Sequence, residues 1–281
     1  MSKIIKRKTM KQNESDMKSQ KNEVCKKTVT KRPSKIEWCE ETLNIATGCD
    51  KISEACEHCY MFNMSPRLKG IYNSGIENGW QNGAKFTLHP ERIDIPLGIK
   101  RKTMFFVNSM SDTFHEDMPF EFLDRFFEMV KQTPHHTYQL LTKRSAIMAK
   151  YFATREVPDN VWLGVTVENA KNKYRIDDLC QVNAKIKFLS IEPLLGDLGE
   201  LNLEGIHWAI LGGESGNKAR PMKEEWAVNV QQQCKNKGVA FLFKQWGNWS
   251  ADGVKKRNKH DNGRLLKGVL YDEYPAVRYN K

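Results

Sequence analysis

Three cysteines lie within eleven residues of this 281-residue chain, in the spacing Cys49-x6-Cys56-x2-Cys59. A Cys-x2-Cys pair with a third cysteine nearby is typical of zinc, iron–sulfur or redox sites. The chain has seven cysteines, an odd number, and no apolar signal segment precedes them, so we expect reduced thiols in a cytoplasmic protein. Cys39, ten residues before Cys49, could complete a tetrahedral zinc site. The motif therefore predicts a metal centre, either a cluster or a zinc ion.

Seven short apolar runs are the elements that must position these cysteines. They are continuous rather than alternating, as in strands that are covered on both faces, and most are separated by segments of helical period. The runs are 43–47, 104–108, 137–142, 161–167, 186–191, 208–211 and 239–244. This order predicts an α/β fold with a parallel sheet, and its near-regular intervals favour a partial, TIM-like (β/α) barrel over a doubly wound open sheet. We expect residues 36–250 to form this domain.

Polar residues follow every one of these runs. In a (β/α) barrel the loops at the carboxyl ends of the strands build the active site, so these side chains should gather around one opening. They are Cys49, Asn108, Ser109, Asp112, Thr142, Lys143, Arg144, Glu168, Asn169, Ser190, Glu192, Glu214, Ser215, Lys244 and Gln245.

Several of these positions have a structural alternative to a chemical role. Asp112 and His115 could be metal ligands or an acid and a base, whereas we expect Asp117 to cap the helix that follows it. The loop 212–216, with two adjacent glycines, could approach an anionic ligand closely or form a tight turn. Lys143 could contact a carboxylate or a phosphate, or carry a solvated charge.

The net charge of +11 is concentrated at the two ends of the chain. Residues 1–35 are rich in Lys and poor in large apolar groups, so we expect a disordered basic tail that either binds DNA or RNA or only improves solubility. Residues 251–281 form a second basic extension. No stretch approaches 18 consecutive apolar residues, so we expect no membrane contact through a spanning helix.

A resemblance to a known family covers residues 36–247. The segments that carry it are 36–38, 47–60, 106–112, 141–144, 162–165, 188–195, 212–216, 219–222 and 243–247. In this order they resemble the three-cysteine-motif family of phage and prophage proteins, a domain of unknown function that is itself similar to the radical S-adenosylmethionine enzymes.

That resemblance implies a cofactor set. In radical S-adenosylmethionine enzymes three cysteines hold a [4Fe–4S] cluster, and the open fourth iron binds S-adenosylmethionine, which an electron cleaves to a radical. Cys49, Cys56 and Cys59 match the three ligands, and His58 matches a ring-bearing residue that packs on the adenine. The expected substrate is a nucleic acid or nucleotide. The expected electron donor is a reductant such as flavodoxin or ferredoxin, and a partner protein could also take part.

Other strand-end residues are expected to complete this site. The expected cofactor contacts are Asn108, Ser190, Glu192, Gly212, Gly213 and Glu214, and the expected catalytic residues are Asp112, Lys143 and Glu192. Two features depart from the superfamily's pattern. Six residues rather than three separate the first two cysteines, and the Gly-Gly-Glu segment follows the sixth run rather than the second, so Glu214 could bind another group.

The sequence is also compatible with two further hypotheses. One is a structural zinc protein in which Cys39 joins the three motif cysteines and the barrel acts as a nucleic-acid-associated binding module. The other is a metal-independent hydrolase or lyase that uses Asp112, Glu168, Glu192 or Lys143.

Overall fold

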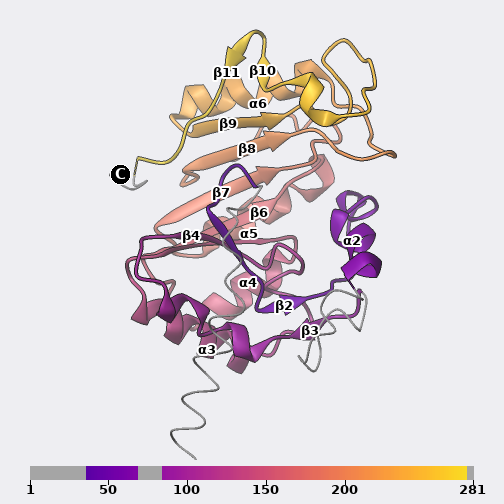
Figure 1. The fold of residues 1–281 in the computed structure, drawn as a ribbon. Coiled ribbons are helices and arrows are strands. Elements are labelled where there is room, and N and C mark those ends of the chain that lie inside the picture. The colour runs from indigo at the N-terminus through magenta and orange to yellow at the C-terminus, as the bar shows by residue number, and fades with distance from the viewer. Residues whose placement is uncertain (1–35, 69–83, 277–281) are drawn as a thin grey trace, which may run out of the picture.

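Seven parallel strands form one sheet in the part of the chain that the computed structural model describes, residues 36–68 and 84–276 (Figure 1). The strands are Glu41–Leu43 (β1), Met104–Val107 (β4), Thr137–Thr142 (β5), Val161–Thr166 (β6), Ile186–Ile191 (β7), Trp208–Gly212 (β8) and Ala240–Gln245 (β9). They pair in chain order, β1-β4-β5-β6-β7-β8-β9, without the reversal of a doubly wound sheet. The sheet curls into a half barrel in which β1 and β9 are edges, so the predicted α/β partial barrel is confirmed.

Helices in the strand connections cover the outer face of this sheet. They are Phe120–Gln132 (α3), Ser145–Phe152 (α4), Tyr174–Gln181 (α5) and Glu224–Lys237 (α6), while Tyr60–Leu68 (α2) follows the cysteines. In α3, Leu123, Phe126 and Val130 recur at helical spacing and join one core with outward-facing strand residues such as Val107 and Leu140. The connection 192–207 between β7 and β8 contains no helix. None of the helices that the structure describes combines the length and the apolar composition that a membrane span requires.

The segment before α3 differs from its prediction. Pro119 occupies the N-cap position directly before α3, and no side chain caps the helix. The expected capping by Asp117 is therefore wrong: the backbone N–H of Asp117 instead donates to Nδ1 of His115, 3.1 Å away. The fixed φ of proline makes it suitable for the entry into a helix, so a side-chain cap is dispensable here.

The first predicted run, 43–47, is split in two. After β1 the chain leaves the sheet, and Ala46–Thr47 (β2) pairs antiparallel with Thr87–Leu88 (β3). Asn44 lies at the break, where its side-chain oxygen accepts hydrogen bonds from the N–H of Met110 at 3.1 Å and the hydroxyl of Ser109 at 3.2 Å. This polar residue ties the end of β1 to the loop after β4, so the run cannot continue as one strand.

The C-terminal segment covers the β9 edge of the sheet. After the hairpin of Leu265–Leu266 (β10) and Val269–Leu270 (β11), the N–H of Phe243 donates to the carbonyl of Tyr271 at 3.0 Å. The N–H of Glu273 donates to the carbonyl of Phe241 at 3.2 Å. Residues beyond 250 thus pack on the sheet, while a domain boundary at that residue stays a prediction.

Aromatic side chains fill the inner face of the half barrel at the amino ends of the strands. Trp38, just before β1, packs edge-on against Phe106 with ring centres 4.5 Å apart, and it also contacts Phe188 and Trp208. Trp162 lies 6.0 Å from Trp208, which is fully buried. Inward-facing positions nearer the carboxyl ends are polar, because every second residue of a strand points inward. One end of the half barrel is therefore closed by rings, and the other is left for a cavity.

We expect Gly164→Ala to lower the free energy of unfolding by about 1–3 kcal/mol, the usual cost of overpacking a core. A Cβ at Gly164 would lie 2.4 Å from the ring of Phe188, which Trp38 and Trp208 hold in place. Gly196→Ala is the matched control, because a Cβ there meets nothing within 4 Å. Urea denaturation of both variants measures the difference, and equal midpoints would contradict this packing.

Candidate functional site

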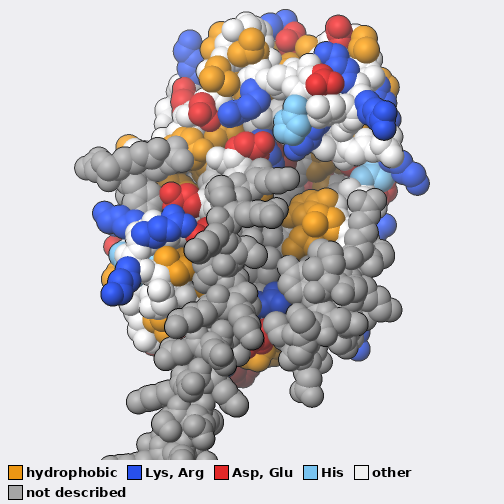
Figure 2. Space-filling view, viewed as in Figure 1, with side chains coloured by type: hydrophobic (Ala, Val, Ile, Leu, Met, Phe, Trp, Pro, Cys, Tyr) orange, Lys and Arg blue, Asp and Glu red, His pale blue; other side chains and the backbone are white. Residues whose placement is uncertain are grey.

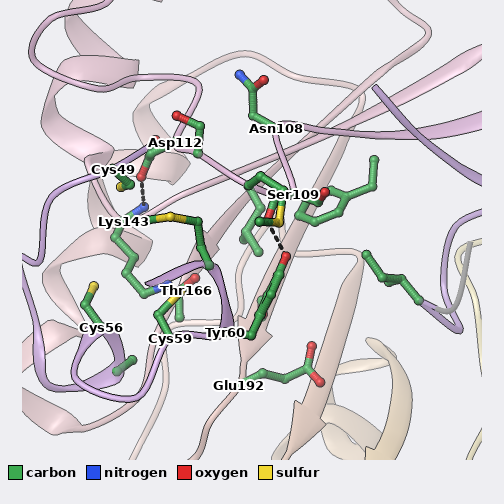
Figure 3. A pocket seen from close by; sticks show the side chains of 18 of the residues that line it. Cys49, Cys56, Cys59, Tyr60, Asn108, Ser109, Asp112, Lys143, Thr166 and Glu192 are labelled. Atoms are coloured by element: carbon green, nitrogen blue, oxygen red, sulfur yellow. Dashed lines mark hydrogen bonds between the residues drawn. The ribbon is translucent and has the colours of Figure 1, made fainter. Parts of the chain in front are cut away.

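A cavity of about 640 Å³ opens at the carboxyl ends of the strands (Figure 3). This volume is in the usual range for small-molecule and cofactor sites. Of the residues predicted from the sequence, those that line it are Cys49, Cys56, His58, Cys59, Asn108, Ser109, Asp112, Thr142, Lys143, Arg144, Ser190, Glu192, Gly213, Glu214, Ser215, Lys244 and Gln245. Gly212 lies behind the wall, next to Glu192 and the backbone of Gln245. The parallel topology thus brings together residues that are up to 196 positions apart, from Cys49 to Gln245.

The three cysteines lie on the loop between β2 and α2, on one side of the cavity (Figure 3). Cys56 ends a short 3-10 helix, Glu54–Cys56, and its backbone N–H donates to the carbonyl of Ser53 at 2.9 Å. Cys59 immediately precedes α2. None of the three forms a disulfide.

Burial sets the protonation of these thiols. It raises the pKa of Cys49 to about 11, and the nearby carboxylate of Asp112 adds to the effect while the Arg144 guanidinium opposes it. Burial also raises the pKa of Cys59, where the Lys143 ammonium acts in the opposite direction. Both side chains are therefore neutral thiols at pH 7 without a metal, and a metal that binds them must displace protons.

The donor set fits an iron–sulfur cluster better than a closed zinc site. Three thiols border one cavity, and Nη1 of Arg144 lies 3.5 Å from Sγ of Cys49, where it would offset the negative charge of ligated thiolates. Cys39 is not part of the cavity wall and packs against the aromatic cluster. Within residues 36–68 and 84–276 no three His, Cys, Asp or Glu side chains are close enough to hold one ion. The four-cysteine zinc site stays a prediction.

Asp112 is used to hold the end of β5. Its Oδ1 accepts from the hydroxyl of Thr142 at 2.6 Å and from the N–H of Phe114 at 3.0 Å. Its Oδ2 accepts from the N–H of Lys143 at 3.0 Å and lies 3.4 Å from Nη1 of Arg144. Both oxygens are therefore engaged within the protein. A catalytic role for Asp112 stays a prediction, and the contacts show a positioning role.

Asn108 has a similar structural environment. Its backbone is in the left-handed region, with φ of 56°, and its side chain is buried. The side-chain oxygen accepts from the N–H of Ala46 at 3.0 Å, and the amide nitrogen donates to the hydroxyl of Thr113 at 3.1 Å. These bonds join β2 to the loop after β4, and contact with a cofactor stays a prediction.

Glu214 and Arg220 join the loop after β8 to the cysteine loop. Nε of Arg220 donates to Glu214 at 2.9 Å, and its Nη2 donates to the carbonyl of Glu54 at 2.9 Å. Nδ1 of His58 lies 3.2 Å from the same carboxylate. Burial raises the pKa of Glu214, but the bonds from Arg220 and His58 outweigh it and hold this pKa below its usual range. Sequence reasoning did not select Arg220, although the segment 219–222 carries part of the family resemblance.

The loop of two glycines also has a packing function. A Cβ at Gly213 would lie 2.0 Å from the carbonyl oxygen of Trp246, so only glycine lets the loops after β8 and β9 approach this closely. The predicted alternative of a tight, close-packed turn therefore describes the contacts of Gly213. An anion contact at this loop stays a prediction.

Two sets of polar groups face each other across the cavity. Glu192 lies on the far side of Tyr60 from the cysteines (Figure 3), and its Oε1 is 3.1 Å from Nζ of Lys244. On the cysteine side, the ammonium of Lys143 makes no hydrogen bond or ion pair with any residue that the structure describes. The hydroxyl of Thr166 is buried in the same wall, also without a partner among those residues.

Two residues considered for chemistry lie outside the cavity wall. Glu168 is fully buried and pairs with Nη1 of Arg175 at 2.8 Å. His115 is buried as well, stacks on Phe86 and lies 3.2 Å from Asp50. The structure does not place either with the other predicted catalytic residues.

The fold and the cavity define an α/β partial-barrel protein with a three-cysteine loop at the mouth of its site. The chain belongs to the family described as protein of unknown function (DUF5131), whose model matches residues 33–275. Among curated proteins, none matches the sequence. The setting in a phage or prophage stays a prediction.

Solved structures of spore photoproduct lyase are similar in part. The complex with dinucleoside spore photoproduct is 12% identical, with a TM-score of 0.43, and the match covers 74% of this chain and 64% of that chain. A double mutant with bound AdoMet and dinucleoside spore photoproduct gives the same identity, coverage and TM-score. The chain thus spans about 64% of the length of these lyase structures.

We expect the alkylation of Cys49 by iodoacetamide at pH 8 to be about a hundredfold slower in the folded, metal-free protein than in the unfolded chain. The pKa rises from 9.0 to about 11, and two pKa units lower the thiolate fraction by that factor. Mass spectrometry of the Cys49 peptide gives the rate, with the urea-unfolded protein as control. Equal rates in both states would show that the thiol is not buried as described.

We also expect Glu214→Gln to lower the free energy of unfolding by about 2 kcal/mol at pH 7, because hydrogen bonds to a charged group are lost. The folded protein holds the pKa of Glu214 below the ordinary 4.5, so its contribution is present above pH 4.5 and is lost as the pH falls through the folded value. The difference from wild type should therefore shrink in acid. Glu225→Gln, at an exposed position of α6, should leave the free energy of unfolding unchanged both at pH 7 and in acid. Denaturant titrations of both variants at the two pH values measure the difference, and equal losses for the two variants would contradict the prediction.

Proposed function

We propose that this protein is an iron–sulfur enzyme that binds S-adenosylmethionine in its cavity and modifies a nucleic acid or a nucleotide of phage metabolism. One observation carries the proposal. Three cysteines of a single short loop and polar residues from successive strand ends line the same cavity at the carboxyl end of a parallel half barrel. This is the end at which (β/α) barrels carry their active sites.

Cys49, Cys56 and Cys59 are the residues that would hold a [4Fe–4S] cluster. When bound, the cluster and S-adenosylmethionine supply one-electron chemistry that generates a radical, with a reductant such as flavodoxin or ferredoxin as the electron source. Arg144, beside Cys49, contributes positive charge where the ligated thiolates would carry negative charge.

The remaining wall offers contacts for a polar ligand. Lys143 and Thr166 have a cation and a hydroxyl without partners among the described residues, so a bound carboxylate would satisfy both. The carboxylate of Glu214 orients the ring of His58, which is expected to pack on the adenine. The aromatic cluster closes the opposite end of the half barrel and keeps water from entering there.

Anaerobic reconstitution with iron and sulfide tests this proposal. We expect about four irons per chain and an EPR signal of the reduced protein that changes when S-adenosylmethionine is added. Alanine variants of Cys49, Cys56 and Cys59 should each lose the signal, because each removes a ligand. Lys143→Ala should keep its iron, but its EPR signal should change only at higher concentrations of S-adenosylmethionine than wild type requires.

Cys180→Ala is the matched control, since this half-buried thiol lies on α5 outside the cavity and contacts the carbonyl of Glu204. It should retain full iron content. One equivalent of zinc with no reducible centre, lost again in Cys39→Ser, would contradict the proposal and favour the structural zinc site.

A further inference from the structure

We propose that an ordered basic surface beside the cavity mouth binds the phosphate backbone of a nucleic acid. This surface, the mouth patch, consists of Lys218, Lys255, Lys256, Arg257 and Lys259. The inference rests on the proposed function, because the patch would hold the substrate of that site. It is separate from residues 1–35, which lie outside the described residues.

The patch includes three cations that no described residue pairs with. Residues 255–260 comprise four Lys or Arg together with Asn258 and His260. Among the described residues, Lys218, Arg257 and Lys259 have neither a salt bridge nor a hydrogen bond from the charged group. Like charges this close repel one another, and an anion with several charges would relieve that repulsion.

A buried amide holds this charged loop in place. Asn248 donates from its side chain to the carbonyls of Lys256 at 2.9 Å and Arg257 at 3.1 Å. Its side-chain oxygen accepts from the N–H of Gly216 at 2.7 Å, and its backbone N–H donates to the carbonyl of Glu214 at 3.1 Å. The charged segment after β9 is therefore held against the loop after β8, so its cations are preorganised and binding costs little ordering entropy.

The position of the patch connects it to the cavity. Glu214 and Ser215, which begin the loop after β8, line the cavity wall, and Lys255 donates to the carbonyl of Asn217 in the same loop at 2.6 Å. Arg220 continues the contact to the cysteine loop. Figure 2 shows Lys, Arg and His side chains toward the upper right of the molecule, where Figure 1 places the loops after β8 and β9. A backbone bound here would bring a nucleotide to the mouth.

The composition of the loop favours a nucleic acid over a membrane surface. A loop that binds anionic lipid pairs its basic residues with apolar side chains that insert below the headgroups. Residues 255–260 contain no apolar residue, and the exposed Val254 is a single apolar side chain beside them. A row of cations on consecutive positions matches the linear charge of a polynucleotide instead.

Oligonucleotide binding by the full-length, metal-free protein tests the patch. The variant carries Lys218→Gln, Arg257→Gln and Lys259→Gln, and the probes are single-stranded DNA, RNA and duplex DNA of equal length. We expect at least tenfold weaker binding than wild type near 100 mM salt. The slope of log K against log salt should be shallower by about 2 for single strands, because three phosphate contacts are lost.

The charge-matched control carries Lys100→Gln, Lys102→Gln and Lys237→Gln, which remove three exposed cations that precede β4 and β9 at the opposite end of the sheet. Its affinity and salt slope should stay within twofold of wild type. Equal losses in both triple variants would overturn the proposal, since the binding would then reflect net charge alone. Binding to anionic vesicles that exceeds binding to every oligonucleotide would overturn it as well.

A second measurement on the unmodified protein needs no variant. Bound oligonucleotide should protect Lys218 and Lys259 from acetylation at least fivefold, with Lys100 and Lys102 unprotected, and equal protection of all four would contradict the proposal. Because both measurements use metal-free protein, a failed reconstitution with intact patch binding would reject only the proposed chemistry. A normal cluster with no patch-dependent binding would reject only this inference.

Discussion

The packing of Trp38, Phe106, Phe188 and Trp208 inside the half barrel is the interaction on which the rest of the structure depends. These rings fill the concave face at one end of a sheet that is not closed by strand pairing. Because side chains alternate along each strand, the strands that contribute rings at their amino ends also contribute inward-facing polar groups near their carboxyl ends. The aromatic cluster and the polar cavity thus both result from the way in which the same strands are aligned in the sheet.

The loops around the cavity are held by polar side chains rather than by secondary structure. Asp112 fastens the end of β5, Asn108 joins β2 to the loop after β4, and Glu214 with Arg220 connects the loop after β8 to the cysteines. The side chains of Asp112, Asn108 and Glu214 are buried, and their bonds are therefore stronger than they would be in water. Polar residues in this wall can either hold the loops in place or bind a ligand. Those whose polar atoms are all bonded within the protein hold the loops. Lys143 and Thr166, which keep atoms without partners among the described residues, remain available to a ligand.

Much of the architecture follows from the sequence because its signals are local. The continuous apolar runs and the helical spacing of Leu123, Phe126 and Val130 each report on a few neighbouring residues, and the order of elements then limits the topology. The break at Asn44 and the bond of Asp117 to His115 in place of a helix cap were not foreseen, since both depend on bonds outside the regular elements. The residues that line the cavity could be predicted because each follows a local apolar run. The hydrogen bonds and ion pairs between their loops could not, because they join distant segments. The bond from Arg220 to the carbonyl of Glu54 spans 166 positions and leaves no local pattern.

The strand of chain that runs along β9 has a consequence for synthesis. The sheet is ordered as the chain is ordered, so each strand leaving the ribosome can pair with the one before it, and the growing edge moves from β4 to β9. An exposed edge is a template for pairing with another molecule. Here the last edge is covered by Tyr271 and Glu273. Tyr274 packs at a tilt against Trp208, and its hydroxyl donates to the carbonyl of Glu37 near the start of the sheet. Protection of β9 against intermolecular strand pairing thus depends on residues that follow the strand by about thirty positions, and a chain cut before Tyr271 would present β9 unprotected.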